Sequence, residues 1–376
     1  MTRKQLIGVV GLGTMGLGIA QVYAQAGYSV IATDAHDEVR NSAVSRLAST
    51  LGKRVATGKL TADARDATLA NLSVTAMPDG MGAADLVIEA IVEKLEVKHA
   101  LFAMLETVVR PGAILATNTS SLSVAAIAEG LIHPSRVLGL HFFNPAPVMK
   151  LVELVAHDTT DPTALEIARK VTEAAGKTVI ACADHPGFIV NRCARPFYGE
   201  ALAMLEEGRS ASDIDASMLA AGYRIGPLSL IDLIGADINL AATEGLAQAM
   251  NGHPRYHAFD ALKKQVARGD LGRKSGHGFL FPDEPGVAPA DASMIALRIE
   301  AALANEAASL LAEGGTSEAG IDMAMKLGLN FPRGPFESAR LHGFEKIRET
   351  LTRLETFAPT HLEGRYAVSP ELAAMV

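Results

Sequence analysis

The sequence is poor in the features that mark several classes of protein. Only Cys182 and Cys193 occur among 376 residues, which excludes a disulfide framework and a cysteine zinc site and is typical of reduced thiols in a cytoplasm. With 34 basic and 42 acidic residues the net charge is −8, which argues against a nucleic-acid or anionic-membrane partner. No uncharged apolar run reaches the roughly 18 residues of a membrane span. We therefore expect a cytoplasmic protein that needs no metal, nucleic acid or membrane.

Short β-branched runs alternate with amphipathic stretches through the N-terminal half. Such alternation predicts a doubly wound parallel sheet. The expected strands are "LIGVVG", "YSVIATD", "LSVTA", "ADLVIEAI", "AILATN", "RVLGLHF", "KLVELV" and "KTVIAC". One polar helical stretch is expected from Asp37 to about Asn71. From Phe188 onward helical patterns dominate, so the predicted fold class is an α/β Rossmann-type domain followed by all-α domains.

The helical region contains an internal repeat. Residues 195–230 resemble residues 298–338, with Glu200 matching Glu306 and Asp215 matching Asp322. Gly208 matches Gly314, and Gly226-Pro227 matches Gly334-Pro335. An ordered series of matches favours duplication over chance similarity of helices. The predicted domains are residues 1–184 (Rossmann-type), 185–282 (first helical domain) and 294–376 (second, non-catalytic helical repeat).

A glycine-rich loop follows the first predicted strand. Gly11, Gly13 and Gly16 fit G-x-G-x-x-G, which allows a tight turn, close approach of a pyrophosphate, and packing of helix against strand. This spacing also argues against reading the apolar start as a signal peptide. Asp34, 23 residues after Gly11, suits the ribose hydroxyls and repels a 2′-phosphate, so NAD is favoured over NADP. The alternative is that Asp34 caps the next helix. The remaining loop residues expected at the cofactor are Thr14 and Met15.

A histidine and a glutamate stand in an otherwise apolar segment, "HFFNPAPVMKLVELV". His141 ends a buried-looking strand, where catalytic groups of such sheets lie, and histidine suits proton transfer near neutral pH. Glu153 is costly to bury without a partner. We expect a Glu153 carboxylate oxygen about 2.6–3.2 Å from a ring nitrogen of His141, brought there by a turn through Pro145 and Pro147.

The chain resembles the L-3-hydroxyacyl-CoA dehydrogenase family over nearly its whole length. The motifs are "VVGLGTMGLGIAQVYAQAGYSV", "DLVIEAIVEKLEVK", "TNTSSLSV", "GLHFFNPAPVMKLVELV", "DHPGFIVNR", "GPLSLIDLIG" and "GRKSGHGF". The resemblance implies NAD-dependent oxidation of (S)-3-hydroxyacyl-CoA to 3-oxoacyl-CoA. It makes His141 the general base and Glu153 its partner, and it places Ser120 and Asn191 beside the substrate. Without the family, Ser120 would be read as a turn or cap residue and Asn191 as a helix cap.

The resemblance also suggests further contacts to the two ligands. The residues expected on the NAD side are Glu93, Lys98, Ser120, Asn144 and Lys274. The residues offered for coenzyme A, in the helical insertion at 46–59, are Thr50, Lys53 and Lys59. Surface salt bridges are the rival interpretation for Lys98 and Lys274.

The second helical copy departs from the usual family pattern. Its counterpart of Asn191 is Leu297, and no second "PGFIVN" occurs, so we expect it to pack on the first copy without catalysing. Short members of the family have one helical domain, which serves largely for dimerisation. The present chain is then either a homodimer or a monomer in which the second copy replaces that dimer contact. Two other functions remain open: a sugar-acid or other hydroxy-acid dehydrogenase of the same superfamily, and a non-catalytic dinucleotide-binding relative.

Overall fold

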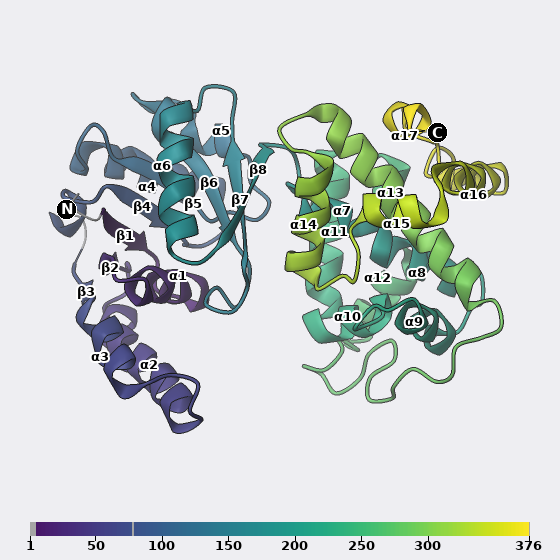
Figure 1. Cartoon of the computed structure of the whole chain (residues 1–376), viewed down its shortest axis with the longest axis horizontal. Coiled ribbons are helices and arrows are strands. Elements are labelled where there is room, and N and C mark those ends of the chain that lie inside the picture. The colour runs from purple at the N-terminus through teal and green to yellow at the C-terminus, as the bar shows by residue number, and fades with distance from the viewer. Residues whose placement is uncertain (1–4, 77–78, 376) are drawn as a thin grey trace. The chain divides into compact units, whose positions relative to one another are not determined.

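The computed structural model describes residues 5–76 and 79–375 and divides the chain into two compact units, residues 1–185 and 186–376. The first unit is built on an eight-stranded sheet of order β3-β2-β1-β4-β5-β6-β7-β8 (Figure 1). Its strands are β1 (Leu6–Val10), β2 (Ser29–Thr33), β3 (Leu72–Val74), β4 (Leu86–Glu89), β5 (Ile114–Thr117), β6 (Val137–Phe142), β7 (Leu151–Ala156) and β8 (Thr178–Ala183). Most of these strands are buried along their length, as expected for a sheet covered on both faces.

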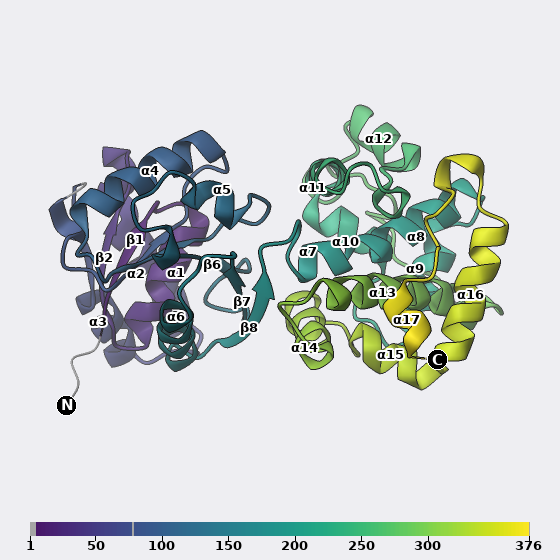
Figure 2. The same cartoon turned by 90° about the horizontal axis from the view of Figure 1, so that it is seen from above.

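Helices cover the sheet on two sides. They are α1 (Thr14–Gln25), α2 (Asp37–Ala56), α3 (Ala62–Ala70), α4 (Leu95–Val108), α5 (Val124–Ala128) and α6 (Pro162–Ala174). Figure 2 shows the sheet between α1 and α6 on one side and α4 and α5 on the other. The polar stretch expected as one helix is two, because the chain turns at Gly58, where φ is 69°, and begins again with Thr61 capping α3.

The sheet is parallel from β3 through β6, and then the chain reverses. β7 pairs with β6 in the antiparallel sense, and β8 pairs in parallel with β7. The eight residues between β6 and β7 are too few for a parallel crossover, which takes a dozen or more. The prediction of a parallel sheet is therefore confirmed for six strands, while the last two run the opposite way.

The second unit is helical and contains both copies of the repeat. The first copy comprises α7 (Val190–Cys193), α8 (Arg195–Glu206), α9 (Ala211–Ala220), α10 (Pro227–Ile234), α11 (Ala236–Ala249) and α12 (Asp260–Ala267). The second comprises α13 (Ala292–Glu313), α14 (Glu318–Leu329), α15 (Pro335–His342), α16 (Phe344–Thr356) and α17 (Pro370–Ala374). α13 packs against α7, α8 and α9 of the first copy and against α15 to α17 of its own. The two copies therefore share one core.

The matched aspartates perform the same task in each copy. Asp215 accepts hydrogen bonds from the backbone N–H groups of Leu228 and Ser229 at the start of α10. Asp322 accepts those of the two counterpart residues, 336 and 337, at the start of α15. In each copy a Cβ on the glycine before the proline would lie 2.2–2.3 Å from this carboxylate group. The conserved order of Asp and Gly-Pro within the repeat thus reflects a buried helix cap that only glycine accommodates.

Among the described residues, no helix is both long and apolar enough to cross a membrane.

Candidate functional site

The glycine loop joins β1 to α1 at the carboxyl edge of the sheet. Gly11 has a φ of 94°, and a Cβ on it would lie 2.5 Å from the carbonyl oxygen of Ala90. A Cβ on Gly16 would lie 1.8 Å from the oxygen of Gly11, so backbone packing requires both glycines. A Cβ on Gly13 would meet no atom of the described residues within 4 Å, and no side chain caps α1 there. Open space before a helix N-terminus fits the pyrophosphate of a dinucleotide.

Asp34 follows β2 and lies against this loop. Its Oδ2 accepts the N–H of Leu12 at 2.7 Å, and its Oδ1 accepts that of His36 at 2.9 Å. The alternative, a cap for α2, is limited to this second bond, because His36 is itself the N-cap residue. Two arginines whose role was not predicted from the sequence lie close by. Arg40 donates to the backbone oxygen of Asp34, and Arg46 donates to the backbone oxygen of Leu12 at 3.0 Å. α2 thereby ties the segment that carries Asp34 and the glycine loop together.

Lys98 belongs to a buried ion-pair network. Its side chain is 1% exposed, and its Nζ lies 2.5 Å from Glu89 Oε1 and 3.1 Å from Glu93 Oε2. Glu93 Oε1 in turn accepts the Oγ1–H of Thr119 at 2.6 Å and the N–H of Ser120 at 2.9 Å. Partial burial pushes the pKa of Glu93 up, but these hydrogen bonds and the Lys98 ammonium lower it overall. Lys98 is therefore not in a surface salt bridge; it anchors the loop that carries Ser120.

His141 and Glu153 stand directly opposite each other on β6 and β7. Opposite side chains of an antiparallel pair stand on the same face, with Cβ atoms about 4.5–5.5 Å apart. His141 Nδ1 lies 2.6 Å from Glu153 Oε2, and the two side chains are 7% and 0% exposed. The contact expected from the sequence is confirmed. A carboxylate at Nδ1 fixes the orientation of the ring and stabilises an imidazolium.

A buried lysine holds the turn between these strands. Lys177 Nζ donates to the carbonyl oxygens of Ala146 at 2.5 Å and Met149 at 2.7 Å. Burial, with a smaller contribution from the Lys150 ammonium, lowers the pKa of Lys177 to about 8. No sequence pattern indicates this role, because Lys177 is distant from the turn along the chain.

The other predicted residues of the first unit lie at its surface. Asn144 is exposed in the β6–β7 turn. Thr50 and Lys53 on α2 and Lys59 after it are also exposed, and the Thr50 hydroxyl donates to the oxygen of Arg46 in its own helix. These positions are therefore accessible to a ligand.

Two predicted residues belong to the second unit. Asn191 is half-buried on α7. Lys274 follows α12, is partly exposed, and forms an ion pair with Asp237 on α11. The salt bridge that was the rival interpretation of Lys274 is thus present. The carboxylate also holds that ammonium at one place on the surface.

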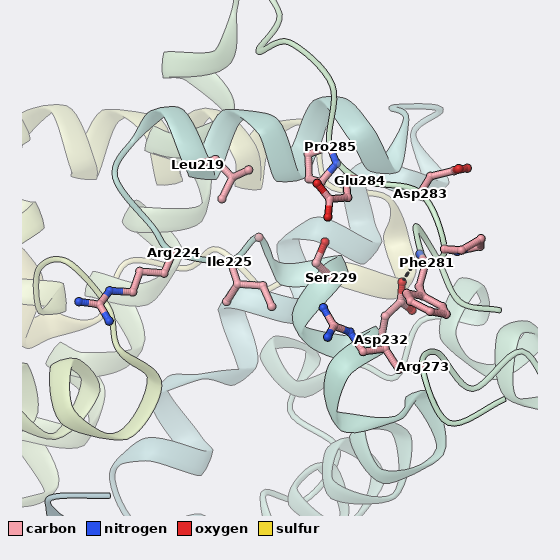
Figure 3. Close-up of a pocket in the computed structure, with 12 residues that line it drawn as sticks. Leu219, Arg224, Ile225, Ser229, Asp232, Arg273, Phe281, Asp283, Glu284 and Pro285 are labelled. Atoms are coloured by element: carbon pink, nitrogen blue, oxygen red, sulfur yellow. Dashed lines mark hydrogen bonds between the residues drawn. The ribbon is translucent and has the colours of Figure 1, made fainter. Parts of the chain in front are cut away.

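The second unit also contains an open hollow of about 460 Å³ beside α9 and α10. Figure 3 shows Arg224, Arg273 and Glu284 around it. Asp232 lies at one side, where its carboxylate accepts the N–H of Phe281 at 2.9 Å. No residue predicted for catalysis or cofactor binding is among those that line it. Acidic and basic side chains both line it, so it does not select a ligand of one charge.

The first unit combines a Rossmann sheet, an open glycine loop, a ribose-type carboxylate and a buried His–Glu pair. Together these features define an NAD-dependent dehydrogenase. Residues 6–185 match the family described as "3-hydroxyacyl-CoA dehydrogenase, NAD binding domain". Residues 187–281 and 294–376 match the family described as "3-hydroxyacyl-CoA dehydrogenase, C-terminal domain". The chain belongs to the 3-hydroxyacyl-CoA dehydrogenase family, and both helical copies fall within the residues matched to its C-terminal domain.

Individual relatives support this assignment. The chain is 46% identical over 280 residues to "3-hydroxyadipyl-CoA dehydrogenase" of Escherichia coli, an alignment that covers 74% of this chain and 59% of that protein. It is 42% identical over 275 residues to a "Probable 3-hydroxybutyryl-CoA dehydrogenase" of Deinococcus radiodurans, covering 72% and 98% of the two chains. A crystal structure of 3-hydroxybutyryl-CoA dehydrogenase from Escherichia coli superposes with a TM-score of 0.91 at 34% identity, over 99% of this chain and 98% of that one.

Proposed function

We propose that the chain oxidises (S)-3-hydroxyacyl-CoA to 3-oxoacyl-CoA, with NAD⁺ reduced to NADH and one proton released. The observation that carries this proposal is the buried contact of 2.6 Å between His141 Nδ1 and Glu153 Oε2. Nδ1 is engaged by the carboxylate, so the proton of the substrate hydroxyl passes to Nε2. Glu153 stabilises the positive charge that develops on the ring. In the reverse direction the imidazolium acts as the acid.

The cofactor fits the residues at the carboxyl edge of the sheet. Gly13 leaves room for the pyrophosphate, Asp34 would accept the ribose hydroxyls, and Thr14 and Met15 begin α1 beneath it. Bound NAD supplies the acceptor for the hydride of C3. The Lys98–Glu93 network holds the loop of Ser120, whose hydroxyl we assign to the substrate oxygen.

The remaining assignments concern the substrate. Asn191 is proposed to orient the thioester so that C3 presents its hydrogen correctly. Asn144 and Lys274 are proposed to lie on the nicotinamide side. The exposed residues Thr50, Lys53 and Lys59 are proposed to contact coenzyme A. The names of the relatives support an acyl-CoA substrate for this chain. A sugar-acid or other hydroxy-acid dehydrogenase is the competing activity, and a non-catalytic dinucleotide-binding protein is the competing class.

One assay separates these candidates. NADH oxidation is measured with acetoacetyl-CoA and with free acetoacetate, in wild type and in His141→Gln. We expect turnover with the thioester far above that with the free acid. We expect kcat of the variant to fall by about 10²–10⁴, with NADH binding preserved. Equal turnover of the two substrates favours the hydroxy-acid enzyme, and no turnover with either favours the binding protein. Near-normal turnover of His141→Gln contradicts the assignment of the base.

We further propose that residues 294–376 replace the dimer contact within one chain. Arg298 of the second copy pairs with Glu200 and Glu207 of the first, while Arg192 of the first pairs with Glu306 and Glu313 of the second. The residues of the second copy in these ion pairs lie 106 positions after their counterparts in the first copy: Arg298 corresponds to Arg192, Glu306 to Glu200, and Glu313 to Glu207. A reciprocal contact of this kind is typical of a two-fold dimer interface. Sedimentation equilibrium should give the mass of one chain, and the mass of two would contradict the proposal.

A further inference from the structure

Asn191 stands on a very short helix. α7 spans Val190–Cys193, and the chain enters it through Gly187 and Phe188, whose φ angles are 76° and 48°. Arg195 Nε donates to the backbone oxygen of Asn191 at 3.0 Å. A single helical turn has few hydrogen bonds of its own. The position of Asn191 therefore depends in part on what the neighbouring residues contact.

The next residue, Arg192, is fixed by the second copy of the repeat. It is 1% exposed, and its Nε donates to Glu306 Oε1 at 2.6 Å. Its two terminal nitrogens donate to the two carboxylate oxygens of Glu313 at 2.6 and 2.7 Å. Both glutamates belong to α13 (Figure 2). A paired guanidinium–carboxylate contact fixes orientation as well as distance, so α13 constrains where the backbone of α7 lies.

The guanidinium of Arg192 keeps its charge in this contact. Burial alone would lower the pKa of Arg192, but the carboxylates of Glu313 and Glu306 raise it overall. Glu306 is fully buried and also accepts the hydroxyl of Tyr256 at 2.6 Å and the guanidinium of Arg255 at 3.1 Å. Removing one carboxylate would leave a buried guanidinium with poorer geometry.

We propose that Arg192 is a positioning residue for the substrate side of the reaction, and that Glu306 and Glu313 of the second copy hold Asn191 in place through it. The non-catalytic repeat is then part of the active-site support. This inference rests on the proposed contact between Asn191 and substrate.

The chain contains its own control for this idea. Arg298 Nε donates to Glu200 Oε2 at 2.9 Å, and its terminal nitrogens donate to Glu207 at 2.6 and 2.8 Å. This mirror cluster has the same composition and crosses the same interface in the other direction. The residue before Arg298 is Leu297, a buried apolar side chain, in place of Asn191. Equivalent substitutions in the two clusters therefore differ mainly in whether Asn191 is adjacent.

The experiment compares Glu313→Gln with Glu207→Gln in the full chain. Urea unfolding, KM for NADH, and kcat/KM for acetoacetyl-CoA are measured for each. We expect both to lower stability, Glu313→Gln to lower kcat/KM for acetoacetyl-CoA about tenfold or more, and Glu207→Gln to leave it near wild type. KM for NADH should not change in either. Equal effects of the two substitutions on kcat/KM overturn the positioning role.

A second pair keeps the test decisive if a glutamine variant does not fold. Arg192→Lys and Arg298→Lys retain the charge but lose the two-point contact, and the same difference in kcat/KM is expected. The double variant Glu313→Gln/Asn191→Ala should have the same kcat/KM for acetoacetyl-CoA as Asn191→Ala alone, because Asn191 transmits the effect of Glu313. Wild-type activity of Asn191→Ala would refute the proposed substrate role of that residue, and the inference with it. If Asn191→Ala lowers kcat/KM, and adding Glu313→Gln lowers it again by the same factor as in the wild type, the inference is refuted while the substrate role of Asn191 stands.

Discussion

His141 Nδ1 and Glu153 Oε2 lie 2.6 Å apart across the antiparallel ladder of β6 and β7. Strand register produces this contact: a slip of one residue would carry one of the two side chains to the opposite face of the sheet. The short turn between the strands fixes that register. The pair is thus set by the register of two buried strands.

The charge of Glu153 should matter more than its shape. Glu153→Gln keeps the volume of the side chain but cannot stabilise an imidazolium or select the ring tautomer in the same way. We expect kcat with acetoacetyl-CoA to fall by about 10²–10⁴, while the dissociation constant of NADH, measured by fluorescence titration, stays constant. Turnover equal to wild type would show that the carboxylate is structural.

Two glycines of the loop should respond differently to alanine. Gly13→Ala meets no atom of the described residues and has an ordinary φ of −64°, so the unfolding free energy should change little. Its methyl group occupies the space assigned to the pyrophosphate, so NADH affinity should fall. Gly16→Ala would place Cβ 1.8 Å from Gly11 O and should destabilise the fold itself. Gly52→Ala, in open space on α2, is the control, and its unfolding free energy should rise by about 0.5–1 kcal/mol. Thermal unfolding and NADH titration of all three test this.

The Asp34 carboxylate should determine the choice between NADH and NADPH. Asp34→Asn removes the charge that repels a 2′-phosphate, and Arg40 lies beside it on α2. We expect the KM for NADH to rise about tenfold, in line with a hydrogen bond to a charged group, and the preference over NADPH to shrink. Asp37→Asn, which alters the exposed partner of Arg40, should keep the wild-type preference. An unchanged ratio of kcat/KM values in Asp34→Asn would contradict the ribose assignment.

Lys177 should make stability depend on pH in the alkaline range. In the folded chain its pKa is about 8, against 10.5 for an unperturbed lysine. Between these values the unfolded state binds more protons, so the unfolding free energy rises with pH. Below about pH 8 the folded chain carries the full penalty of the buried ammonium.

Comparison with Lys177→Met isolates this contribution. The urea midpoint of the wild type should rise relative to that of Lys177→Met between about pH 7.5 and about pH 11, limits that bracket the two pKa values. Lys170→Met, at an exposed lysine on α6, should follow the wild-type trend. Parallel curves for wild type and Lys177→Met would disprove the depressed pKa.

Sequence reasoning succeeded where the signal is local. The glycine loop, the strands and the facing of His141 and Glu153 follow from spacing within one or two elements. The partners of Lys98 and the roles of Arg46 and Lys177 depend on packing between elements remote in the chain, which no periodicity encodes. The roles of Ser120 and Asn191 remain predictions, because they rest on family motifs and on contacts to ligands.

The reciprocal interface of the two helical copies has a genetic consequence. In a dimer of identical chains, one codon change alters both halves of the contact at the same time. Here Arg192 and Arg298 are encoded separately, so one half can drift while selection preserves the other. The replacement of Asn191 by Leu297 is a difference of this kind. A duplication of this type can change a residue such as Asn191 in one copy while the ion pairs between the two copies are kept.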